Sequence, residues 1–163
     1  MNISEQQKEF LNLCVVEQLS YKTIAEKLGV PNSTLTIWYE ELKEERLAIA
    51  TIRTLWTRKK IKMAFSDFYK WYQSRERKCT YCEITEAEIK ELIDTGRLTT
   101  KRLTTRGRKL ELERKQSELE YDNFENLAFA CYWCNNAKTD TFSEEEFLKV
   151  GSVFKEIWKQ RLG

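Results

Sequence analysis

Apolar residues recur at helical spacing along most of this chain, and the pattern predicts a mainly helical protein. Residues 4–19 carry one such stripe, and residues 20–38 hold two shorter helical segments separated by Gly29. The same spacing returns over residues 47–77. Apolar and polar residues alternate over residues 110–114, which predicts a strand. We therefore expect mainly α structure with a small β-hairpin.

The segment over residues 20–38 has the composition of a tight connection between two helices. Gly29 permits a sharp turn, and Pro31 is placed to begin the second helix. The segment resembles the helix-turn-helix family, which implies that its second helix enters the DNA major groove and presents Ser33 and Thr36. A three-helix packing module without DNA contact is the alternative. Carboxylates that would repel phosphate follow at Glu40, Glu41, Glu44 and Glu45.

Composition and charge narrow the class of protein. The chain has 163 residues, of which 41% are hydrophobic and 33% charged, as is normal for a globular protein. Its net charge of +2 is too small to indicate a polyanionic partner by itself. The sequence shows no signal peptide and no apolar span of membrane length, so we expect a cytoplasmic protein without a membrane partner. Nothing in the sequence indicates an oligomeric state.

Four of the five cysteines form two Cys-x-x-Cys pairs, Cys79 with Cys82 and Cys131 with Cys134. Thiols stay reduced in the cytoplasm, where such pairs favour a metal over disulfides. Two intervening residues let both sulfurs of a pair reach one ion, so the pairs predict a structural Zn²⁺ held by four thiolates. Redox or coincidental cysteines are the alternative. Cys14 lies on the first apolar stripe and is predicted to pack in the core.

A basic segment lies between the two cysteine pairs. Threonines alternate with cations there, and this composition suits contacts with phosphates along a nucleic-acid backbone. The cations expected to bind nucleic acid are Lys101, Arg102, Arg106 and Arg108.

The order of motifs over residues 79–147 is specific. A Cys-x-x-Cys is followed by an acidic–basic strand end, a Glu-Asn-Leu, and a Cys-x-x-Cys-Asn-x-x-Lys-x-Asp. This order resembles the HNH endonuclease family, and the resemblance implies a ββα-metal, treble-clef-like domain around a catalytic divalent ion. The expected organisation is a helix-turn-helix module (residues 1–50), a helical connector (51–78) and an HNH-like zinc domain (79–163).

The resemblance also implies roles for individual residues. Glu113 is the expected ligand of the catalytic ion, and Asn135 completes that metal site. Asn126 orients the residue in the position of the catalytic base, and Lys138 contacts the scissile or a neighbouring phosphate. Carboxylate and amide oxygens are hard donors, so Glu113 and Asn135 suit Mg²⁺ or Mn²⁺ better than zinc.

Arg114 stands where the family normally has the histidine that accepts a proton, and the chain contains no histidine. A guanidinium group stays protonated, so Arg114 is expected to stabilise transition-state charge or to position a water molecule. The sequence thus predicts a metal-dependent endonuclease that hydrolyses phosphodiester bonds in DNA. The alternatives are a catalytically inactive DNA-binding protein on an HNH scaffold and an adaptor with a zinc knuckle.

Overall fold

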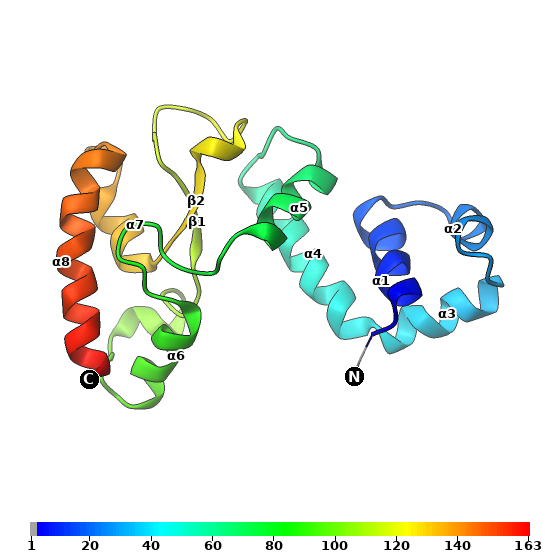
Figure 1. The fold of residues 1–163 in the computed structure, drawn as a ribbon, viewed down its shortest axis with the longest axis horizontal. Coiled ribbons are helices and arrows are strands. Elements are labelled where there is room, and N and C mark those ends of the chain that lie inside the picture. Colours follow the sequence, from blue (N-terminus) through cyan, green and yellow to red (C-terminus); the bar gives the residue numbers. More distant parts are fainter. Residues whose placement is uncertain (1–2) are drawn as a thin grey trace. The chain divides into compact units, whose positions relative to one another are not determined.

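The computed structural model describes residues 3–163, which form two compact units that divide between Ser74 and Arg75 (Figure 1). The predicted fold class is confirmed, because helices dominate and the sheet found within residues 3–163 has two strands. None of the helices in this part of the chain combines the length and apolar character needed to cross a bilayer. The finer division of the sequence into three segments stays a prediction.

The first unit is entirely helical. Its helices are α1 (Glu5–Leu11), α2 (Tyr21–Leu28), α3 (Asn32–Glu41), α4 (Lys43–Arg58) and α5 (Phe65–Ser74). A π-helical turn, Asn12–Val16, extends α1, and the chain leaves the helix at Gln18, whose φ is 58°. The helix predicted over residues 4–19 is therefore too long, because a left-handed residue cannot continue a right-handed helix.

The turn between α2 and α3 has the predicted form. Gly29 adopts a left-handed conformation with φ 65° and ψ 34°, and its amide donates to the carbonyl of Ala25. Phe10, Ile24 and Leu35 are completely buried where the first three helices meet. The geometry of this segment follows its sequence, whereas a role on DNA stays a prediction.

The second unit joins a small sheet to three α-helices. In chain order, its helices and strands are α6 (Glu86–Asp94), β1 (Glu111–Arg114), β2 (Leu127–Ala130), α7 (Tyr132–Lys138) and α8 (Glu144–Leu162). Short 3₁₀ turns, Lys101–Thr104 and Phe124–Asn126, precede the two strands. Helix α6 begins with a capping box between Thr85 and Glu88, which satisfies amides at its N-terminus.

Strands β1 and β2 pair antiparallel, with Leu112 opposite Phe129 and Glu113 opposite Ala128. Alternation along β1 sends Leu112 to one face of the sheet and the neighbouring glutamates to the other. The outer edge of β2 is also occupied, because the amide of Thr80 donates to the carbonyl of Phe129 at 2.7 Å. The first cysteine pair thus lies directly beside the sheet.

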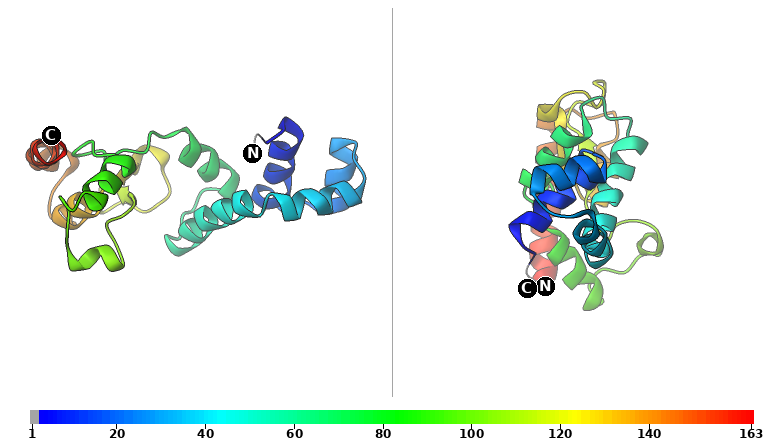
Figure 2. Two further views of the ribbon diagram at one scale, coloured as in Figure 1. Left: turned by 90° about the horizontal axis from the view of Figure 1, so that it is seen from below. Right: turned by 90° about the vertical axis from the view of Figure 1, so that its right-hand side faces the viewer.

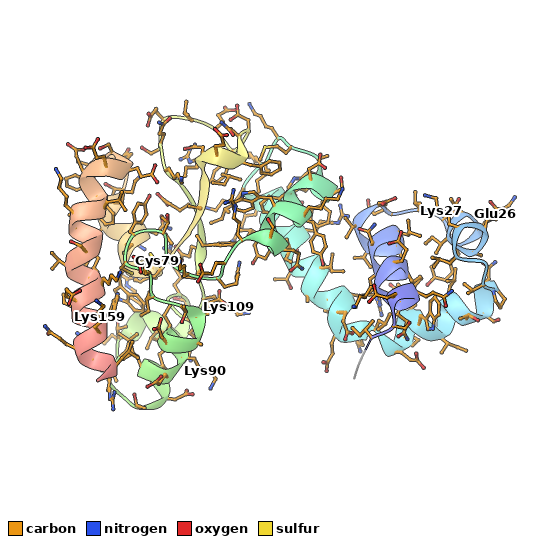
Figure 3. All side chains as sticks on the ribbon, in the orientation of Figure 1. Glu26, Lys27, Cys79, Lys90, Lys109 and Lys159 are labelled. Carbon is orange, nitrogen blue, oxygen red and sulfur yellow. The ribbon has the colours of Figure 1, made fainter. Side chains whose placement is uncertain are left out.

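The two cysteine pairs converge in the interior of the second unit, where Cys79 is labelled in Figure 3. All four cysteines are buried, and their sulfur atoms lie within 4.8 Å of one another. Cys82 Sγ and Cys131 Sγ are 3.7 Å apart. Tetrahedral zinc with Zn–S bonds of about 2.3 Å requires sulfur–sulfur distances of about 3.8 Å. The cluster therefore fits a structural zinc site.

Four thiols this close cannot all ionise on their own, because like charges in a buried site repel one another. Hydrogen bonds from the Cys131, Cys134 and Cys82 thiols hold the pKa of Cys79 far below its usual value. The pKa of Cys134 is raised, chiefly by its hydrogen bond with Cys131. A divalent cation bound there would replace the shared protons and let all four sulfurs bind as thiolates.

Helix α8 packs on the turn between Cys79 and Cys82. A Cβ atom at Gly151 would lie 2.5 Å from the backbone oxygen of Tyr81, so only glycine allows this approach. The Tyr81 ring meets Phe147 edge to face, with 5.0 Å between their centroids. Lys155 also pairs with Glu83 at 2.7 Å. These contacts fix which side of α8 faces the core.

The cluster generates a prediction about metal content and folding. The purified chain should contain about one zinc ion, and Cys79→Ser should lose both the zinc and the folded second unit, because the metal supplies folding free energy there. Metal analysis combined with circular dichroism would measure both effects. Cys14→Ser is the matched control, since Cys14 lies outside the cluster and should leave the zinc content unchanged. A second unit that stays folded in a strong chelator would contradict the prediction.

Candidate functional site

Two glutamates project from one face of β1 towards α7. Glu111 and Glu113 are two residues apart and therefore share a face of the strand. Their cross-strand partners are Ala130 and Ala128, whose small side chains leave room for α7 on this face. The start of α7 is fixed by Cys131, whose sulfur accepts a hydrogen bond from the amide of Cys134 at 3.4 Å.

The ammonium group of Lys138 meets Glu113 inside the protein. Lys138 Nζ lies 3.3 Å from Glu113 Oε1 and donates to the carbonyl of Arg114 at 3.4 Å. Lys138 has no exposed surface, and Glu113 is only 8% exposed. Charges this deeply buried persist only when they are paired. In this structure the ammonium group of Lys138 is enclosed and lies against β1. Its expected contact with a phosphate stays a prediction.

Glu111 is held by side chains from two directions. Arg106 donates Nε to Oε1 at 2.9 Å and Nη2 to Oε2 at 2.7 Å, while Asn135 Nδ2 donates to Oε2 at 2.6 Å. The hydrogen bond with Glu111 raises the pKa of Arg106. The structure thus joins Asn135 to Glu111, although the sequence paired it with Glu113. Arg106, which was expected to bind nucleic acid, is engaged by the same carboxylate.

Arg114 ends β1 and lies over the loop that follows it. Its Nη1 donates to the carbonyl of Leu119 at 2.9 Å, and its guanidinium carbon is 4.9 Å from the centre of the Tyr121 ring. The side chain is half-buried. A guanidinium group carries five N–H donors, so the bond to Leu119 uses only one of them.

Asn126 closes the loop after β1. Its Oδ1 accepts from the amide of Gln116 at 2.8 Å, and its Nδ2 donates to the carbonyl of Gln116 at 3.2 Å. Its own carbonyl accepts from the amide of Lys115 at 2.9 Å. The side-chain amide of Asn126 thus fixes the backbone that begins just after Arg114. The expected role of Asn126 in orienting Arg114 stays a prediction.

The basic segment divides into engaged and exposed cations. Arg108 Nε donates to the carbonyl of Leu103 at 2.8 Å, which holds the segment against its own backbone. Lys101 and Arg102 are exposed at the 3₁₀ turn before β1. In the first unit, Ser33 and Thr36 are exposed on α3. Contact of any of these residues with nucleic acid stays a prediction.

Glu111 is a functional candidate that the sequence interpretation did not assign. The signal was present, because the alternation over residues 110–114 places Glu111 on the same strand face as Glu113. Within this strand, the resemblance to the family assigned roles only to Glu113 and Arg114, at the strand end. The structure adds Glu111 through its bonds with Arg106 and Asn135.

A separate cleft of about 420 Å³ lies along β2, and Lys78, Lys115 and Phe129 contribute to its walls. Neither Glu113 nor Lys138 lines it. The candidate site is therefore the contact between β1 and α7, not this cleft.

Comparisons with known proteins give the family. No protein-family model matches the chain, and no curated protein matches it significantly. Among solved structures, the rare-cutting HNH restriction endonuclease PacI is similar to this chain, with 30% sequence identity and a TM-score of 0.48. The similarity covers 61% of this chain and 67% of that enzyme. The sequence identity over that share of the enzyme, joined to the buried four-cysteine cluster, shows that the chain belongs to the HNH-type family.

Proposed function

We propose that this protein is a metal-dependent endonuclease that hydrolyses phosphodiester bonds in DNA. The observation that carries the proposal is the β1–α7 contact, where the carboxylates of Glu111 and Glu113 meet Asn135 and Lys138 beside Arg114. Acidic, amide and cationic groups in one place are the parts that hydrolysis of a phosphodiester requires. The similarity to an HNH restriction endonuclease supports DNA as the substrate.

The residues present fit a hard divalent cation. The environment of Glu113 accommodates positive charge, because the buried ammonium group of Lys138 lies 3.3 Å from its carboxylate. The carboxylate of Glu113 and the side-chain oxygen of Asn135 would hold Mg²⁺ or Mn²⁺, and Glu111 keeps Asn135 in place. Such an ion stabilises negative charge on the scissile phosphate and activates water as a nucleophile.

The two cations beside the acidic pair have different tasks. Lys138 supplies the positive charge that pairs with the carboxylate of Glu113 in its buried position. Arg114 stands at the strand end with N–H donors besides the one used by Leu119. It would stabilise the charge that develops on the phosphate, because a guanidinium group cannot accept a proton.

A catalytically inactive DNA-binding protein on the same scaffold is the second candidate. It is favoured by the absence of histidine from the whole sequence, which removes the usual proton acceptor. Both candidates require DNA binding, and they differ only in whether the β1–α7 contact cuts the backbone.

A nicking assay tests the catalytic proposal. The chain should nick supercoiled plasmid in Mg²⁺, Mn²⁺ or Ni²⁺, and Glu113→Ala and Asn135→Ala should each lower the rate by about a hundredfold or more, because they remove groups that act on the metal. Glu118→Ala is the control, since Glu118 is exposed in the loop after β1 and should keep full activity.

Wild-type protein that fails to nick in any of the three metals would eliminate the endonuclease and leave the inactive DNA-binding candidate. Nicking that survives both substitutions would place the active site elsewhere. The zinc content of each variant shows whether the fold was kept.

The buried ion pair generates a second prediction, with thermal stability as the readout. Lys138→Met should lower the free energy of unfolding by about 3–5 kcal/mol, because it leaves the Glu113 carboxylate buried without its ammonium partner. Mg²⁺ or Mn²⁺ should raise the melting temperature of this variant more than that of the wild type, since the cation replaces the lost charge.

The double variant Glu113→Gln with Lys138→Met is the matched control. It should recover most of the lost stability and lose the extra response to the metal, because neither charge remains. Equal metal responses in the wild type, the single variant and the double variant would show that Glu113 does not bind the ion.

The exposed cations generate a prediction about DNA affinity. Replacing both Lys101 and Arg102 by alanine should weaken binding and reduce the slope of log K against log salt by about two, because two phosphate contacts are lost. Lys90→Ala is the control, since Lys90 lies on the outer side of α6 and already pairs with Asp94 (Figure 3). An unchanged slope in the double variant would remove the 3₁₀ turn from the DNA-binding surface.

A further inference from the structure

Helix α8 carries two apolar stripes, and only one of them is used within its own unit. Phe147, Gly151 and Trp158 are buried against the core. On another side of the helix, Val150 is 39% exposed and Val153 is 59% exposed. The side chains of Val150 and Val153 on this second side are therefore exposed to solvent.

The second stripe has the spacing of a helix–helix seam. Its members are Val150, Val153, Phe154 and Ile157, and steps of three and four residues keep them on one side of the helix. Phe154 and Ile157 are half-buried at the border with the core. Single exposed apolar residues are common on protein surfaces, whereas a continuous stripe on one helix indicates an interface.

Charges close both ends of this stripe. Glu146 lies one turn before Val150, and Arg161 lies one turn after Ile157. Hydrogen bonds from the backbone amide and hydroxyl of Ser143, both 3.0 Å long, fix the Glu146 carboxylate. The stripe therefore runs from an acidic end to a basic end.

We propose that this stripe pairs with the same stripe of a second copy of the chain, with the two α8 helices antiparallel. A two-fold axis between Val153 and Phe154 sets Val153 against the partner's Phe154 and Val150 against the partner's Ile157. The same axis sets Glu146 against the partner's Arg161. Each apolar residue then meets an apolar residue, and each charge meets its opposite, as an isologous interface requires.

Charged residues beside the apolar stripe fit the same two-fold symmetry. Lys149 and Glu156 are exposed on one side of the stripe, and the antiparallel axis brings Lys149 close to the partner's Glu156. Glu156 also pairs with Lys159 of its own helix at 3.0 Å, in an exposed contact that leaves the carboxylate accessible. A parallel pairing would instead set Glu146 against the partner's Glu146 and Arg161 against the partner's Arg161, so the charges of the stripe favour the antiparallel arrangement.

Helix α8 lies at one edge of its unit. In the left view of Figure 2, α8 is seen along its axis, and the other elements of its unit lie to one side of it. A contact limited to one helix from each subunit is small, so we expect a dissociation constant in the micromolar range, about 1–100 µM.

Sedimentation equilibrium of the full chain over that concentration range tests the pairing. The wild type should form dimers, and Val153→Glu should raise the dissociation constant by about tenfold or more, because two carboxylates would lie beside the two-fold axis. Leu148→Glu is the matched control, since Leu148 is 44% exposed on the same helix but lies outside the stripe. It should dimerise like the wild type.

Exchange of the charges at Lys149 and Glu156 distinguishes the proposed antiparallel register from other modes of dimerisation through α8. Lys149→Glu alone and Glu156→Lys alone should each weaken the dimer by about twofold to tenfold, and the double exchange should restore it. A wild type that stays monomeric at about 100 µM overturns the proposal. A dimer that Val153→Glu leaves intact, or one that Leu148→Glu disrupts equally, overturns it as well.

Discussion

Convergence of four cysteine sulfurs is the constraint on which the second unit depends. Cys131 serves twice, because its sulfur belongs to the cluster and also accepts the amide hydrogen bond that begins α7. The other cysteine pair, Cys79 and Cys82, is held at the edge of β2 by the hydrogen bond from the amide of Thr80. One metal-binding cluster therefore sets the position of the sheet, the start of α7 and the turn on which α8 rests. A metal ion bound to the cluster would cross-link this small unit and stabilise its fold.

The candidate site is a consequence of that geometry. The cluster fixes the start of α7, and the helical rotation then carries Asn135 and Lys138 towards β1. The small side chains of Ala128 and Ala130 on the neighbouring strand leave room for this approach. The positions of the proposed catalytic groups thus depend on the cysteine cluster. Loss of the cluster would therefore disrupt the fold and the candidate site together.

Much of this could be predicted from sequence, for reasons that particular residues make clear. The paired cysteines, the alternation over residues 110–114 and the turn at Gly29 are local patterns with local causes, and each was found where it was expected. The burial of Lys138 and its pairing with Glu113 were not predictable, because they depend on how α7 turns against a strand far away in sequence. The early end of the first helix at Gln18 had no signal, since neither glycine nor proline marks it.

The ion pairs on β1 have a consequence for the approach of a substrate. Each glutamate on the α7 side of the strand is matched by a cation from the chain itself, Glu111 by Arg106 and Glu113 by Lys138. Two carboxylates side by side without these cations would repel a polyanion such as the proposed DNA substrate. In the proposed endonuclease, this local cancellation of charge would leave the acidic residues that hold the cation without an electrostatic barrier around them.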